Sequence, residues 1–356
     1  MMRRSVLILL LLSAWLLGYA EVREQAVTYM SVDQHGDSIR LSGLLSIPDS
    51  ARGIILIPHY TIAACDESPS QKPTGEAKAF RDNYVLLMPD YIGYGITCER
   101  THPYLHGALT ARNTVDMLLG LQPMLDSLSL GISLDSIYIV GYSQGGAAAL
   151  WTLRLLEEEY ADRIHVRQCF AGSAPVDVAS IYEMALQTGR ADMPALIPLL
   201  VAGTCEAYDI DLPLSTFFTP ALERCYTRYI ATKQYHMLSL YFRMPNHRLS
   251  HWLTPAGMDL STPAASQLYR GLLRSSLVHY PLDGVGDSIC PTWTPRSPLY
   301  VFHSTRDEIV PFLNAEHLRR CYPDVRTITW DLDRYKGHIG SSRIFFRKVR
   351  QMLDNP

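Results

Sequence analysis

A serine between two glycines is the first sign of chemistry in this chain. Residues 141–145 read Gly-Tyr-Ser-Gln-Gly, directly after the apolar run Ile137–Val140 and directly before the helix-forming residues Gly146–Leu150. A tight strand-to-helix turn projects a serine hydroxyl, and the start of the helix faces any negative charge that develops there. The pattern therefore predicts that Ser143 is a nucleophile. The alternative is a glycine turn without a chemical role.

A serine hydroxyl needs a base that takes its proton and an acid that orients the base. In the expected chain order the acid comes first and a histidine follows. Asp307 follows the apolar run Leu299–His303, and His338 lies in a glycine-containing segment after the next run, which we expect to be a loop. We expect Ser143, His338 and Asp307 to form a triad. Glu308 is the alternative acid, and Asp307 is preferred for its distance to the following Val-Pro pair.

Acyl transfer through a serine also requires two hydrogen-bond donors for the oxyanion of the tetrahedral intermediate. The backbone N–H of Gln144, next to the serine, is one expected donor. The second should come from the loop after the apolar run Gly53–Ile57. There we expect the backbone N–H of Thr61, with Tyr60 as the alternative.

Short apolar runs alternate with helical patterns along the chain. The runs are Gly53–Ile57, Tyr84–Met88, Ile137–Val140, Val166–Ala171, Leu299–His303 and Thr327–Leu332, and the helical patterns are Ala108–Leu125, Gly145–Glu158, Phe312–Cys321 and Arg343–Leu353. Such runs are typical of strands that helices cover on both faces. A hairpin of Val27–Val32 and Ile39–Ile47 precedes them. The fold class is therefore α/β, with a mostly parallel central sheet flanked by helices.

The alternation stops between residues 178 and 293. Proline recurs there, and the helical patterns are Ile181–Gln187, Thr227–Phe242 and Ala264–Leu277. We interpret residues 178–293 as a helical cap inserted into a core made of residues 21–177 and 294–356. The apolar segment Ala195–Ala202 is either a lid helix or a buried helix of this cap, and it is too short to cross a membrane.

The first 20 residues have the composition of a secretory signal peptide. Arg3 and Arg4 precede an apolar run, and small residues occupy the cleavage positions, with Ala20 last. An uncleaved anchor helix is the alternative. We expect cleavage and a secreted or periplasmic protein without a stable membrane span, in which 30 Lys and Arg stand against 35 Asp and Glu.

Composition excludes several classes of protein. The chain has 356 residues, of which 47% are hydrophobic and 19% charged, so it can bury a core and is not disordered. Lys and Arg are spread along it, which excludes a nucleic-acid partner. His247 and His251 have the spacing of metal ligands on a helix, but the glutamate of a metalloprotease helix is missing. No metal or organic cofactor is implied, and His317 falls in a helical pattern.

Seven cysteines in an exported chain permit disulfides but leave at least one cysteine over. The first pairs to test are Cys65 with Cys98 and Cys205 with Cys225, although spacing does not determine connectivity. Cys169 lies inside an apolar run, and we expect a buried free thiol there.

These motifs resemble the α/β-hydrolase superfamily, and in particular the secretory lipase family and related bacterial exported esterases. The matching segments are residues 141–145, Asp307–Pro311 and Gly337-His338, together with Pro89–Gly95, His102–Tyr104, Ala111-Arg112 and Asp116-Met117. The resemblance spans residues 53–175 and 298–353 and is weaker across the cap. It implies an α/β-hydrolase fold. The chain departs from other esterases at His59-Tyr60-Thr61, where they have His-Gly-Gly, so the second oxyanion donor stays open between Thr61 and Tyr60.

We therefore expect an exported serine hydrolase of the lipase or esterase type, which cleaves small carboxylic esters through an acyl-enzyme. The apolar, Tyr-rich cap favours an apolar acyl or aryl group. One alternative is an exported serine peptidase of the same fold that acts on short or proline-containing peptides, with Glu183, Glu206 or Glu223 holding the substrate amine. Another is a binding protein with a decayed hydrolase fold.

Overall fold

Eight strands form one sheet in the order β1-β2-β4-β3-β5-β6-β7-β8. The structure is a computed structural model that describes residues 22–128, 130–134 and 137–355, so the predicted signal peptide lies outside the described residues. The strands are β1 Arg23–Val32, β2 Ser38–Ile47, β3 Ile54–Leu56, β4 Val85–Pro89, β5 Ile137–Tyr142, β6 Val166–Gly172, β7 Leu299–Ser304 and β8 Ile328–Asp333. Each lies where the sequence predicts a strand.

The sheet is parallel except at one edge. Strands β1 and β2 form an antiparallel hairpin, and β2 joins β4 in antiparallel pairing. From β4 to β8 every neighbouring pair is parallel. Both faces of the sheet are buried, because Ile54 and Leu56 pack into one hydrophobic cluster while Ile55 and Ile57 pack into another. The predicted α/β class with a mostly parallel sheet is confirmed.

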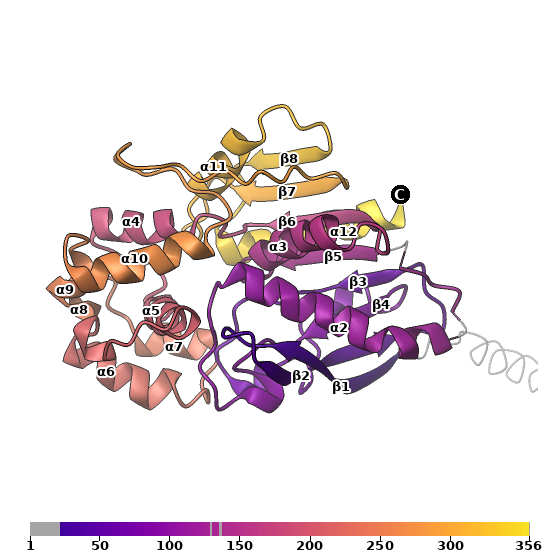
Figure 1. Cartoon of the computed structure of the whole chain (residues 1–356), viewed down its shortest axis with the longest axis horizontal. Helices are drawn as coiled ribbons and strands as arrows, with labels where there is room; N and C mark the ends of the chain where they lie inside the picture. The colour runs from indigo at the N-terminus through magenta and orange to yellow at the C-terminus, as the bar shows by residue number, and fades with distance from the viewer. Residues whose placement is uncertain (1–21, 129, 135–136, 356) are drawn as a thin grey trace, which may run out of the picture.

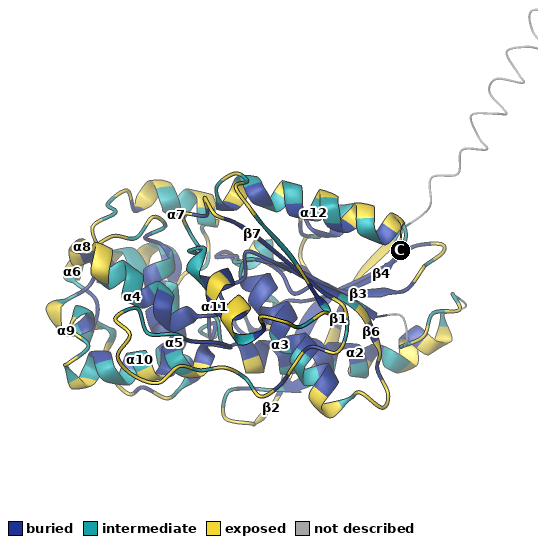
Figure 2. Cartoon of the chain, turned by 90° about the horizontal axis from the view of Figure 1, so that it is seen from above, coloured by how far each residue is buried: buried dark blue, intermediate teal, exposed yellow. Residues whose placement is uncertain are grey.

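Helices cover the two faces of the sheet. The core helices are α2 Gly107–Ser127, α3 Gln144–Glu159, α11 Leu313–Cys321 and α12 His338–Asp354. Leu118, Leu153 and Leu318 place α2, α3 and α11 against one face, and Phe345 of α12 packs against the other. Figure 2 shows α12 along one side of the sheet and α2 and α3 along the other. The serine turn and the histidine segment can therefore meet at the end of the sheet.

The helices between β6 and β7 gather at one end of the sheet, at the left of Figure 1. They are α4 Val178–Thr188, α5 Leu196–Ala207, α6 Pro220–Cys225, α7 Met237–Arg243, α8 Leu249–Trp252, α9 Pro255–Met258 and α10 Pro263–Ser275. We call residues 178–293 the insertion. Phe217, Leu240 and Trp252 belong to its own hydrophobic cluster. None of the helices in the described ranges is both long and apolar enough to cross a membrane.

One predicted helix of the insertion is wrong. Instead of a continuous helix over Thr227–Phe242, a short π-helical segment ends at Ile230 and α7 begins at Met237. Lys233 lies between them with a φ of 48°. Its ammonium group donates hydrogen bonds to the core carbonyls of Gly93, Cys98 and Arg100. The spacing of apolar residues carries no information about these hydrogen bonds to the core. The two helical segments are separated where Lys233 makes them.

A second set of buried polar contacts, after those of Lys233, links both ends of the insertion to the core. Asp177, directly before α4, accepts hydrogen bonds from Nδ1 of His279 at 2.9 Å and from Nδ1 of His317 at 2.6 Å. His279 belongs to the returning end of the insertion and His317 to α11. Burial by itself raises the pKa of Asp177, but these hydrogen bonds and those from Ser180 outweigh it and lower the pKa. The carboxylate therefore stays charged and fastens the insertion to the core.

Two disulfides join described residues, and one of them was among the two pairs to test first. Cys65 pairs with Cys98, and Cys290 pairs with Cys321. Cys205 and Cys225, the other pair to test, are both free and pack beside the hydrophobic cluster of the insertion. Two cysteines that are close in sequence form a disulfide only if the fold brings their side chains together. Cys169 is free and buried, as predicted.

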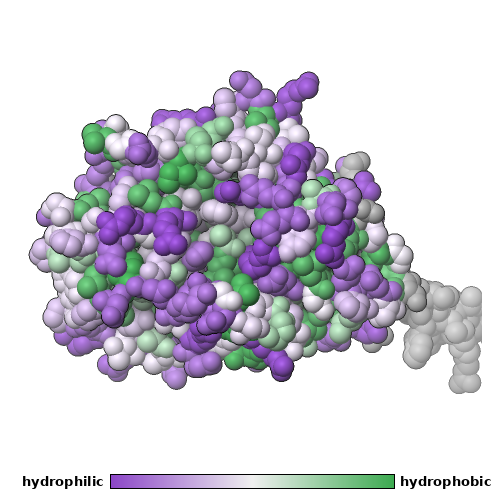
Figure 3. Space-filling model, viewed as in Figure 1, coloured by the Kyte–Doolittle hydropathy of each residue, from purple (hydrophilic) through white to green (hydrophobic). Residues whose placement is uncertain are grey.

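Hydrophilic side chains cover most of the face seen in Figure 3, with smaller apolar patches over the insertion and the core. Short helical turns complete the described chain and connect the longer elements. They are η1 Cys65–Glu67, η2 Ala77–Ala79, η3 Gly95–Thr97, η4 Leu214–Thr216 and the π-helical η5 Tyr226–Ile230.

Removing the second disulfide should destabilise the protein. The Cys290–Cys321 bond joins residues 31 apart, so replacing both with Ala should lower the free energy of unfolding by about 3–4 kcal/mol. The matched Cys205→Ala, Cys225→Ala variant removes no bond and should lose less than about 1 kcal/mol. Urea unfolding measures both. Equal losses in the two variants would contradict the disulfide assignment.

Candidate active site

Ser143 lies on a tight turn between β5 and α3. Its φ of 58° is left-handed, which is uncommon for a residue other than glycine and is typical of a strained functional turn. Its N–H donates to the Gly172 carbonyl at 2.8 Å, so β6 holds the turn. A Cβ at Gly141 would overlap the Gly145 carbonyl, and one at Gly145 would overlap the Pro58 carbonyl. Both glycines are needed for close backbone contact.

The structure brings the three predicted triad residues together. Ser143 Oγ lies 2.9 Å from His338 Nε2, and His338 Nδ1 lies 2.7 Å from Asp307 Oδ2. A carboxylate only accepts hydrogen bonds, so Nδ1–H donates to Asp307 and Nε2 is left to accept from the serine hydroxyl. This is the arrangement that a general base requires.

His338 is the first residue of α12 rather than part of a loop, which corrects the expected loop. Its backbone N–H donates to Glu308 Oε2 at 3.0 Å. A Cβ at Gly337 would overlap that carboxylate, which explains the glycine before the histidine. Glu308, the alternative acid, therefore binds the backbone of the histidine, while Asp307 binds its ring.

Backbone donors hold Asp307 in place. Its Oδ1 accepts from Ile309 N at 3.1 Å and from Val310 N at 2.9 Å. Burial by itself raises the pKa of Asp307, but the hydrogen bond from His338 and the nearby His303 outweigh it, so the pKa is lowered. The carboxyl is thus ionised at neutral pH and can stabilise a positive charge on His338.

The Gln144 side chain is held by His102, which has a structural role. The Gln144 side-chain amide donates to His102 Nε2 at 2.8 Å, and His102 Nδ1 donates to the Ile92 carbonyl at 2.7 Å. Burial lowers the pKa of His102 to about 3, so its ring is neutral and keeps an acceptor nitrogen toward Gln144. The only sequence signal for this contact is that His102 belongs to a segment of the family resemblance.

The two alternatives for the second oxyanion donor lie in the loop after β3 and have different neighbours. Tyr60 lies near Glu76, a buried side chain that sequence reasoning missed and that accepts a hydrogen bond from the Thr74 hydroxyl at 3.2 Å. Thr61 contacts Tyr104 instead, with 2.8 Å between the two hydroxyl oxygens. Thr61 and Tyr60 both stay candidates for the second oxyanion donor. No motif marks Glu76, which follows a glycine in a loop.

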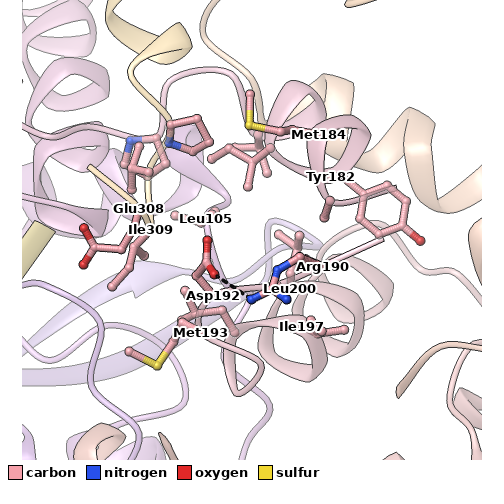
Figure 4. A pocket seen from close by; sticks show the side chains of 18 of the residues that line it. Leu105, Tyr182, Met184, Arg190, Asp192, Met193, Ile197, Leu200, Glu308 and Ile309 are labelled. Carbon is pink, nitrogen blue, oxygen red and sulfur yellow. Dashed lines mark ion pairs between the residues drawn. The ribbon is translucent and has the colours of Figure 1, made fainter. Parts of the chain in front are cut away.

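Ser143 opens into a cavity of about 360 Å³ between the core and the insertion. Aliphatic side chains of α4 and α5 form much of its wall, among them Ile181, Met184, Ile197 and Leu200. Ile309 and Glu308 from the acid loop also line the cavity, and Figure 4 shows them across from Met184, Ile197 and Leu200. The ion pair of Arg190 with Asp192, 3.8 Å apart, also lines the cavity and is half exposed. The cavity is therefore mainly apolar, with few polar groups.

The two histidines considered as metal ligands have other surroundings. His247 Nδ1 lies 3.0 Å from the Ala191 carbonyl, and the His251 ring packs edge-on against Trp252. Across residues 22–128, 130–134 and 137–355, no three His, Cys, Asp or Glu side chains are grouped as metal ligands would be.

The sheet and its flanking helices have the α/β-hydrolase fold. Solved structures share this fold at low sequence identity. The rice cell wall degrading esterase LipA from Xanthomonas oryzae superposes with a TM-score of 0.78 at 20% identity, over 94% of this chain and 91% of that one. Candida antarctica lipase A gives a TM-score of 0.67 at 16% identity, over 92% and 81%.

Curated relatives are secreted lipases. The chain is 25% identical over 305 residues to the secreted triacylglycerol lipase LIP5 of Malassezia furfur, covering 84% of this chain and 72% of that protein. It is 24% identical to the secreted triacylglycerol lipase LIP3 of Malassezia restricta, of which it spans only 59%. No family model matches the chain. The chain is thus distantly similar in sequence to secreted lipases.

Replacing each acid separately should show which one serves the histidine. Asp307→Asn removes the acceptor for Nδ1–H and should lower kcat on a p-nitrophenyl ester roughly 10³–10⁴-fold. Glu308→Gln keeps an oxygen that can accept from the His338 N–H and should lower kcat less than about tenfold. A larger loss for Glu308→Gln would reverse the assignment.

Glu76 should make stability depend on pH. Burial raises its pKa from the usual 4.5 to about 8, so between these values the folded protein holds a proton that the unfolded chain has lost. Stability from this group is complete at low pH and falls as pH rises through that window. Glu76→Gln cannot ionise, so its free energy of unfolding relative to wild type should rise by at most about 1.4 kcal/mol per pH unit.

Urea unfolding at about pH 5 and about pH 8 would measure this difference. The exposed Glu316→Gln variant is the control and should follow wild type at both pH values, because water already solvates that carboxylate. A constant difference between Glu76→Gln and wild type would show that Glu76 does not titrate in this range.

Proposed function

We propose that this protein is a secreted or periplasmic serine hydrolase that cleaves carboxylic esters through an acyl-enzyme. The observation that carries the proposal is the hydrogen-bonded series Ser143, His338 and Asp307, of which Ser143 lines an apolar cavity. The similarity to secreted lipases supports the reaction class and the compartment. The two disulfides fit an oxidising compartment.

Each residue has a separate task in this mechanism. Ser143 Oγ attacks the ester carbonyl while His338 Nε2 takes its proton, and Asp307 stabilises the resulting imidazolium. The N–H of Gln144, at the start of α3, and a donor from Thr61 stabilise the oxyanion. His338 then returns the proton to the leaving alcohol, and a water activated by the same ring releases the acid.

The insertion acts as a cap that selects the substrate. Its helices α4 and α5 supply aliphatic walls next to the nucleophile, and such walls favour an apolar acyl or aryl group. The names of the similar proteins mention triacylglycerol and plant cell wall as substrates of those proteins. For this chain we propose an ester with an apolar acyl or aryl part that fills the cavity beside Ile197 and Leu200.

The peptidase alternative has less support from the site. Such an enzyme needs a carboxylate for the substrate amine, and Glu183, Glu206 and Glu223 were the candidates. None of these three lines the described cavity at Ser143. Glu183 accepts hydrogen bonds from the Tyr269 hydroxyl and the Leu282 N–H, and Glu206 accepts from Gln34.

Two carboxylates do line the cavity, and both are engaged. Asp192 pairs with Arg190, and Glu308 accepts from the His338 N–H. The intact hydrogen bonds between Ser143, His338 and Asp307 also favour an enzyme over a binding protein with a decayed site.

Ser143→Ala should abolish hydrolysis, because the attacking oxygen is lost, while Ser266→Ala on α10 should keep wild-type kcat. Initial rates on p-nitrophenyl esters of rising acyl length, beside aminoacyl-proline amides, measure activity and selectivity. We expect a loss of at least about 10³-fold for Ser143→Ala, selective fluorophosphonate labelling of Ser143, and a preference for esters. Wild-type rates in Ser143→Ala would overturn the proposal, and faster amide cleavage would favour the peptidase.

A further inference from the structure

We propose that Tyr142, the residue before the nucleophile, positions His338 by holding its backbone. The Tyr142 hydroxyl donates a hydrogen bond to the His338 carbonyl oxygen at 2.6 Å. Tyr142 is therefore a positioning residue that acts through the histidine. The inference rests on the proposed ester hydrolysis, in which His338 moves the protons.

The direction of each hydrogen bond at Tyr142 follows from the groups involved. A carbonyl oxygen only accepts, so the tyrosine O–H donates to His338. The Ser173 hydroxyl lies 2.9 Å from the tyrosine oxygen and donates to it. Burial raises the pKa of Tyr142, because a charged phenolate would lose its solvation. The tyrosine proton therefore stays in the bond to His338.

The backbone of His338 is held on both sides of its Cα atom. As the first residue of α12 it has an N–H without a partner inside the helix, and Glu308 accepts from this group at 3.0 Å. Tyr142 binds the carbonyl on the other side, and its ring packs against the imidazole with 5.2 Å between ring centroids. Because Asp307 also holds Nδ1, Nε2 stays directed at Ser143.

The tyrosine ring is packed between β6 and α12. A Cβ atom at Gly172 of β6 would lie 2.5 Å from this ring and 2.9 Å from the Phe345 ring of α12. The ring centroids of Tyr142 and Phe345 are 5.5 Å apart. Only 3% of Tyr142 is exposed, so close packing keeps its hydroxyl at the His338 carbonyl.

The serine turn thereby determines the position of the nucleophile and of the base. Tyr142 directly precedes Ser143, whose N–H donates to the Gly172 carbonyl at 2.8 Å. Ser173, the residue after β6, donates its N–H to the Phe302 carbonyl of β7 at 2.7 Å. These contacts join β5, β6, β7 and α12 at one end of the sheet. A displacement of α12 from the serine turn would have to break the bond from Tyr142.

The reaction requires His338 to move a proton twice at Nε2. This nitrogen takes the proton of Ser143 during the attack and then gives it to the leaving alcohol. Both transfers depend on the alignment of donor and acceptor. Tyr142 does not line the described cavity, so loss of its hydroxyl should lower kcat and leave KM nearly unchanged.

Tyr142→Phe keeps the ring and removes the hydroxyl. It should lower kcat on p-nitrophenyl butyrate roughly 10–10²-fold, with KM within about twofold of wild type. The loss of kcat/KM should be at least about threefold larger on ethyl butyrate, because ethoxide needs a proton from His338 to leave and p-nitrophenolate does not. The rate of fluorophosphonate labelling of Ser143 should fall in parallel, since that attack also needs the base.

The matched control removes a similar bond at the far end of the same helix. Tyr84 is also 3% exposed, and its hydroxyl donates to the Leu353 carbonyl of α12 at 3.2 Å. Tyr84→Phe should lower the urea midpoint about as much as Tyr142→Phe but keep wild-type kcat. Equal kcat in the two variants, whether reduced or at the wild-type level, would overturn the inference.

A second variant tests the same contact without changing the tyrosine. Ser173→Ala removes the hydrogen bond that Tyr142 accepts and should lower kcat about threefold. Added to Tyr142→Phe, it should cause no further loss. If Tyr142→Phe does not fold, a wild-type kcat in Ser173→Ala overturns the inference.

Failure of this inference is distinguishable from failure of the proposed function. If wild type hydrolyses esters and Ser143 is labelled, but Tyr142→Phe keeps full kcat, the inference fails and the function stands. If wild type neither hydrolyses esters nor is labelled, the proposed function fails, and this inference fails with it.

Discussion

The hydrogen bond between Asp307 and His338, 2.7 Å long, joins the loop after β7 to the first residue of α12. It determines which ring nitrogen carries the proton, so Nε2 can accept from Ser143. Three further contacts keep it in place: two backbone N–H groups hold Asp307, and Glu308 holds the backbone of His338. The parallel order of β5, β6, β7 and β8 brings these loops to one end of the sheet.

Buried polar contacts organise the rest of the molecule around this end. Lys233 donates to three core carbonyls, and Asp177 accepts from histidines at the far end of the insertion and in α11. In each case hydrogen bonds provide partners for a charged group that would otherwise be costly to bury. The insertion is thereby held over the nucleophile, and the cavity between insertion and core takes its apolar wall from α4 and α5.

Much of the fold and of the site could be predicted from local patterns. The apolar runs lie in the eight strands, and Ser143, Asp307 and His338 meet as their chain order suggests. The wrong predictions concern contacts between distant segments. Cys205 and Cys225 are close in sequence but form no disulfide, and Lys233, which binds core carbonyls, lies between two short helical segments where one helix was expected.

The sequence by itself determined the strands, the glycine turn and the order of nucleophile, acid and base, because these depend on side-chain periodicity and on backbone geometry within a few residues. Only the tertiary structure decided which partner each polar group meets. His102 reaches Gln144, Tyr104 reaches Thr61, and Cys290 reaches Cys321 across many residues of chain. Packing of whole elements brings such groups together, and no local pattern records the outcome.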